Sequence, residues 1–205
     1  STAGLIGISD FQFGAGDITA KYNSKASDGT YVDFTQFGGG SGLDVSTGGT
    51  PATHTIGFTS PLIEAEGSVA LDAFGFVVAK GTFGLKKLSG VAINDGNTSF
   101  TADVLQLSTT LSGFAGVGAR LDQDPVTDVS TVNVVTTDAI GFSLSSATID
   151  LVIAQDTGAL GDKYLGLEVA LTNAGLVGVT DLTFVASGLV QVNDGPAAGR
   201  LDWSA

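Results

Sequence analysis

The sequence contains no cysteine and no methionine, and it has only one histidine, one tryptophan and eight lysines and arginines in 205 residues. Without cysteine, no disulfide bond can stabilise the fold. The formal net charge of −13 leaves no basic face, so nucleic acid is excluded as a partner, and an acidic membrane surface would repel the chain. The longest uncharged run, residues 45–63, contains Pro51 and Pro61, so no membrane insertion is expected.

Glutamate is also scarce, since only three of the 21 acidic residues are glutamate and the rest are aspartate. Glutamate favours helices, whereas aspartate favours turns and caps. Apolar side chains alternate with polar ones over residues 62–73, 149–153 and 165–171, which is the pattern of half-buried strands. No window of about 12 residues has helical spacing with caps.

These patterns predict an all-β chain of roughly a dozen strands, largely antiparallel, in a single domain over residues 1–205. The architecture is expected to be a multi-stranded sandwich or an elongated, repeat-like β structure, with a β-solenoid as the alternative. Three motifs predict tight hairpin turns, and the phenylalanines on apolar phases are expected in the core. The turn motifs are Ser27-Asp28-Gly29, Asn94-Asp95-Gly96 and Asn193-Asp194-Gly195; the phenylalanines are Phe74, Phe76, Phe83, Phe100 and Phe184.

One strand changes its apolar phase partway along. The apolar positions run through Phe100, Ala102 and Val104 and then continue at Leu105 and Leu107. A shift by one residue is the effect of a β-bulge, so a bulge is predicted between Phe100 and Leu107.

The two ends of the chain resemble each other. Residues 3–13, AGLIGISDFQF, and residues 174–184, AGLVGVTDLTF, are identical at six of eleven positions, and after a gap VDFT (32–35) resembles LDWS (201–204). We therefore expect residues 3–35 and 174–205 to be equivalent parts of a repeat of about 170 residues, one of them completed by another copy through strand pairing. The side chains predicted to mediate this self-association are Leu5, Ile8, Phe11, Phe13, Leu176, Val179, Leu182 and Phe184.

Several longer stretches carry a family resemblance. The stretches GSVALDAFGFVVAKGTFGLKK (67–87), GFAGVGA (113–119) and AGLVGVTDLTFVASGLVQVND (174–194) resemble tandem repeat units of very large bacterial secreted or surface proteins, adhesin-like and associated with calcium-binding RTX modules. The RTX nonapeptide itself is absent. The resemblance implies a repetitive protein that is secreted or displayed on the cell surface, and it transfers no catalytic residue.

Catalytic motifs are missing. His54 stands alone, no Gly-x-Ser-x-Gly motif surrounds any serine, and no glycine-rich loop leads into a lysine-bearing helix. Glu64 and Glu66 lie two apart on one strand face, which is explained by solvation and does not require a glycosidase pair. The chain is therefore predicted not to be an enzyme.

Calcium is the one ligand that the composition favours. This ion prefers carboxylate and carbonyl oxygens, and three aspartates lie in the loop 121–129. The candidate ligands are Asp122, Asp124 and Asp128 in this loop, and Asp28, Asp95 and Asp194 in the Asp-Gly turns.

Together these observations predict a structural module of an extracellular or cell-surface fibrous protein that binds copies of itself. The alternative is a calcium-dependent adhesin domain that binds glycan or another surface partner. A glycan hydrolase or lyase on a β scaffold is a third reading, which lacks a cluster of convergent polar residues.

Overall fold

The chain is all-β, as predicted from its alternating pattern, and about 60% of it is strand. The computed structural model describes residues 3–5, 10–158, 160–197 and 199–204. Its only helical element there is the short 3-10 helix η1 (Phe34–Gln36). The strands are β1 (Ala3–Leu5), β2 (Phe11–Asn23), β3 (Leu43–Ser46), β4 (Thr53–Ile56), β5 (Leu62–Ala73), β6 (Val77–Asn94), β7 (Ser99–Val117), β8 (Arg120–Leu121), β9 (Val134–Val135), β10 (Ile140–Asp156), β11 (Lys163–Val177) and β12 (Val185–Asp194).

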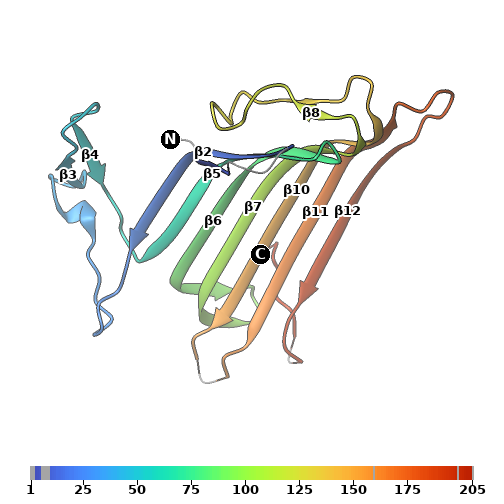
Figure 1. Cartoon of the computed structure of the whole chain (residues 1–205). Coiled ribbons are helices and arrows are strands. Elements are labelled where there is room, and N and C mark those ends of the chain that lie inside the picture. The colour runs from blue at the N-terminus through green and yellow to red at the C-terminus, as the bar shows by residue number, and fades with distance from the viewer. Residues whose placement is uncertain (1–2, 6–9, 159, 198, 205) are drawn as a thin grey trace.

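Eight of these strands form one open antiparallel sheet in the order β1-β2-β5-β6-β7-β10-β11-β12 (Figure 1). Neighbours in the sheet follow one another along the chain, apart from the small two-stranded sheets β3-β4 and β8-β9 that are inserted between them. The long strands thus form an extended sheet with β1 at one edge and β12 at the other, and the described residues form neither a closed barrel nor a solenoid.

The two faces of this sheet differ sharply. One face, which we call the trough face, carries the polar side chains of the central strands, including Glu64, Lys86, Gln106, Ser108 and Asp150. The other, which we call the apolar face, carries the alternate residues of the same strands, most of which are aliphatic. This division follows from strand geometry, because successive side chains point to opposite sides.

At one end, residues 118–139 fold over the trough face (Figure 1). Leu121, Val129 and Val132 are buried there against Val78 and Phe114 of the sheet. The acidic loop expected from the sequence therefore acts as a cover, with its apolar side chains turned inward. Backbone contact is close, since a Cβ on Gly14 would lie 2.5 Å from the Pro125 oxygen.

At the other end, residues 199–204 cover the same face. Leu201 is buried in a second cluster with Ala102, Val104, Ala154 and Tyr164. The backbone N–H of Asp202 donates a 3.1 Å hydrogen bond to Asp95, which ties this segment to the β6–β7 hairpin. The trough face thus has an apolar core at each end and a polar middle.

A bulge does occur in the stretch predicted from the sequence, between Phe100 and Leu107, but it lies on the neighbouring strand, opposite Ala102 and Val104. β7 pairs with β10 without interruption there, and the register shift lies in β6, between Leu88 and Val91. The apolar phase changes because Ala102 and Val104 lie under the Leu201 segment on the trough face, whereas Leu105 belongs to the apolar face. The pattern changes at the point where the apolar side chains of β7 pass from the trough face to the apolar face.

Two other expectations need correction. Only Asn94-Asp95-Gly96 joins paired strands as a hairpin, since the other two turn motifs lead from β2 and β12 into segments outside the sheet. Of the phenylalanines expected in the core, Phe74, Phe76 and Phe184 are exposed, because they lie at the end of the apolar face or in the adjoining turn. Phe114, which the pattern did not single out, is buried.

Candidate self-association site

The two ends of the chain adopt the same strand register. In the β1–β2 pair, Ala3 faces Ala15 and Gly4 faces Gly14. In the β11–β12 pair, Ala174 faces Ala186 and Gly175 faces Val185, which are the same positions one repeat later. Both second strands follow an aspartate in the left-handed region, Asp10 with φ 61° and Asp181 with φ 62°.

A set of hydrogen bonds beyond the strands is also shared. The side-chain amide of Asn23 donates to the Val32 oxygen at 3.1 Å, and that of Asn193 donates to the Leu201 oxygen at 2.8 Å. After these asparagine bonds, Asp33 accepts hydrogen bonds from the backbone N–H and the hydroxyl of Thr35. Asp202 accepts the same two hydrogen bonds from Ser204. The side-chain bonds hold the pKa of each aspartate below its ordinary value.

Sequence reasoning did not single out Asn23 and Asn193. Each asparagine is the polar anchor at the end of its strand, but the spacing to the VDFT and LDWS motifs differs by one residue between the two ends. An alignment without a gap therefore hides their correspondence.

The surroundings of the two ends differ at one position. Leu201 is 2% exposed, because it packs on Val104, Ala154 and Tyr164, which belong to the strands that precede it in the sheet. Its counterpart Val32 is 46% exposed. Among the described residues, β1 is the only strand beside β2 on this side, and it has three residues. No strands equivalent to β7, β10 and β11 therefore cover Val32 there.

The structure positions most of the side chains predicted to self-associate. Leu5 pairs in register with Phe13, and Ile8 lies outside the described residues. The Leu176 N–H donates to the Phe184 oxygen at 3.0 Å. The Phe184 ring makes an edge contact with Phe142, with centroids 6.2 Å apart, and the Phe11 ring lies 6.0 Å from that of Phe74. Val179 and Leu182 are exposed. Pairing of these residues with another copy stays a prediction.

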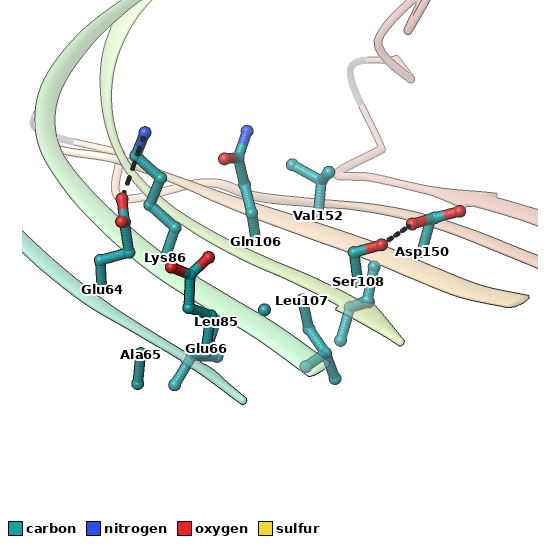
Figure 2. A pocket seen from close by; sticks show the side chains of 12 residues that line it. Glu64, Ala65, Glu66, Leu85, Lys86, Gln106, Leu107, Ser108, Asp150 and Val152 are labelled. Atoms are coloured by element: carbon teal, nitrogen blue, oxygen red, sulfur yellow. Dashed lines mark hydrogen bonds and ion pairs between the residues drawn. The ribbon is translucent and has the colours of Figure 1, made fainter. Parts of the chain in front are cut away.

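The polar middle of the trough face forms a shallow hollow of about 450 Å³ (Figure 2). Glu64 makes ion pairs with Lys21 and with Lys86, and the Ser108 hydroxyl donates to Asp150 at 2.6 Å. The hydrogen bond from Lys21 and the charges of both lysines lower the pKa of Glu64, so this carboxylate is ionised at neutral pH. Glu64 is therefore held as a charge partner and is unsuited to proton donation.

The loop aspartates predicted to bind calcium accept hydrogen bonds from within residues 122–133. Asp122 accepts from the backbone and the side chain of Asn133, Asp124 from the Val126 N–H, and Asp128 from Ser130. Hydrogen bonds lower the pKa of Asp122 and of Asp128. Within the described ranges, no three acidic or histidine side chains converge as a metal ion requires. Calcium binding stays a prediction.

The turn aspartates Asp28, Asp95 and Asp194 likewise accept backbone N–H groups nearby, which explains their place in turns without a metal. His54 is exposed on β4, opposite Val45. In the described part of the chain, no helix is long and apolar enough to cross a membrane.

Comparison with protein-family models, with curated proteins and with solved structures finds no match to this chain.

Proposed function

We propose that this chain is a structural repeat module of a fibrous protein that is secreted or displayed on a cell surface. In this proposal, successive units share one continuous sheet, and the strands at the end of one unit are the first strands of the next. The cellular location rests on the resemblance to repetitive bacterial surface proteins.

The observation that carries the proposal is the common geometry of the two ends. Shared register alone is weak support, because many hairpins have similar pairing. The side-chain bonds of Asn23 and Asn193 to equivalent carbonyls add a second, independent feature far from the hairpin turn. Repeats of this kind stabilise one another mainly through contacts between neighbouring units.

The exposure of Val32 indicates where the preceding unit would lie. If strands equivalent to β7, β10 and β11 stood before β2, they would cover Val32 as they cover Leu201. They would also pair with the part of β2 beyond Ala15, which has no partner on its β1 side among the described residues. One preceding unit would therefore both bury the Val32 side chain and pair with the open edge of β2.

A two-unit chain tests this proposal. Residues 1–171 followed directly by residues 1–205 keep the repeat spacing, so the end of the first unit becomes the start of the second. The matched control joins residues 1–205 to residues 1–205, which duplicates the shared segment. We expect electron microscopy to show one continuous rod for the first chain and two bodies at variable angles for the control. Two separate bodies in both chains would overturn the proposal.

A further inference from the structure

The apolar face of the sheet is a broad surface that no other element of the described residues covers. Leu85, Leu107, Leu151 and Leu167 form one row across four neighbouring strands. Both apolar clusters of buried residues lie on the opposite face, and in the described part of the chain no strand packs across this one. At its borders large side chains are open to solvent, including Phe142 at 54% and Val190 at 58% exposure.

The face is continuous and uncharged in its centre. Between the row of Ala65 and the row of Ala73, the paired positions of β5, β6, β7, β10, β11 and β12 carry no charged side chain on this side. Neighbouring side chains cover two of the central glycines, since a Cβ on Gly81 would lie 2.6 Å from the Leu111 side chain and one on Gly67 would lie 3.3 Å from the Phe83 ring. The result is a broad surface without an aqueous channel through its middle.

Its size is that of a stable interface. With six strands about 4.8 Å apart and five rows about 6.6 Å apart, the patch covers roughly 900 Å² on each copy, against about 800 Å² per partner in a standard protein interface. Sheets bury such faces against another layer about 10 Å away.

The charge distribution selects the partner. The chain carries a net charge of −13, and four carboxylates of the central strands, Glu64, Glu66, Asp150 and Glu168, lie on the trough face. Two copies that meet through their apolar faces keep these carboxylates on the outside, two layers apart. An anionic lipid surface would meet no lysine or arginine in the centre of the patch.

We propose that the apolar face packs against the same face of a second copy, so that two sheets form a sandwich with both trough faces outward. This inference goes beyond the proposed repeat function, because it concerns the face of the sheet and not its edges. The two-unit chain reports only on the edges, so the two ideas can fail separately.

The test uses the full chain and two variants of adjacent residues on β7. Leu107→Lys places a charge in the centre of the apolar face, and Gln106→Lys places the same charge on the exposed trough face. Sedimentation across a range of concentrations should give a dimer for the wild type and for Gln106→Lys, with association at least about 100-fold weaker for Leu107→Lys. A monomeric wild type, or equal effects of the two variants, overturns the proposal.

A second measurement does not depend on whether Leu107→Lys folds. The chain has no cysteine, so Thr109→Cys and Thr110→Cys each give one site for a pyrene label, on the apolar and the trough face respectively. Excimer emission from Thr109→Cys alone supports the face-to-face pair, since the two labels then lie in one interface. Emission from Thr110→Cys, from both or from neither overturns it, as does binding of the unlabelled chain to phosphatidylcholine vesicles in place of dimerisation.

Discussion

Leu201 and Val32 occupy corresponding positions in the two ends, and the same truncation at each should have very different costs. Leu201 is 2% exposed and contacts Val104, Ala154 and Tyr164, so Leu201→Ala leaves a cavity under residues 199–204. Such truncations cost about 2–5 kcal/mol. Val32 is 46% exposed, so Val32→Ala removes little buried surface and should cost less than about 1 kcal/mol.

Urea unfolding, followed by circular dichroism, measures both free energies. The emission of Trp203, the only tryptophan, reports in parallel whether residues 199–204 detach before the sheet unfolds. The decisive comparison repeats Val32→Ala in the second unit of the two-unit chain that keeps the repeat spacing. There the preceding unit should cover Val32, and the cost should rise to about 1–3 kcal/mol. An equal, small cost in both contexts would refute the reasoning that links exposure at this position to a missing neighbour.

Three further predictions concern the covers and the loops. Gly166→Ala places a Cβ 2.9 Å from the Trp203 ring, so Trp203 emission should shift to longer wavelength, whereas Gly84→Ala on the same face, with nothing within 4 Å, should leave it unchanged. If the loop 121–129 binds calcium, the midpoint of thermal unfolding should rise with calcium relative to chelator, and Asp124→Asn should remove that response; coincident melts would contradict it. The pKa of Asp122 is lowered from 3.8 by its hydrogen bonds from Asn133, so its contribution to stability is present above that value and is lost as the pH falls through the folded pKa. The difference in unfolding free energy between wild type and Asp122→Asn should therefore be smaller at pH 3 than at pH 7, and an unchanged difference would argue against this role.

The local sequence was sufficient to predict strands, because a period of two reports directly on which side each residue faces. The alternation over residues 62–73 and 165–171 corresponds to β5 and β11. The Asn94-Asp95-Gly96 turn was also predictable, since Gly96 adopts a φ of 85° that glycine tolerates. The similarity of residues 3–13 and 174–184 likewise needed only comparison of the chain with itself.

Tertiary structure decided which face of each strand is covered, and where along its length. A strand pattern treats any apolar side chain as buried, but Leu107 lies on a face that nothing in the described chain covers, while Val104 lies under Leu201. That difference arises from two segments distant in sequence, 118–139 and 199–204, which fold onto one side of the sheet. It also explains the change of phase after Val104, which the alternation alone could not separate from the nearby register shift on β6.

The sequence likewise identified the acidic loop but not its structural role. Aspartates in a loop suggest ligands, because composition reports charge and not hydrogen-bond partners. In the folded chain Asp122 accepts two hydrogen bonds from Asn133, eleven residues away, while Val129 and Val132 bury the loop against the sheet. The hydrogen-bond partners of the loop depend on how it packs against the sheet, which the residue types alone do not reveal. The sequence pattern therefore determines the strands of this protein, and the tertiary structure determines which segments cover them.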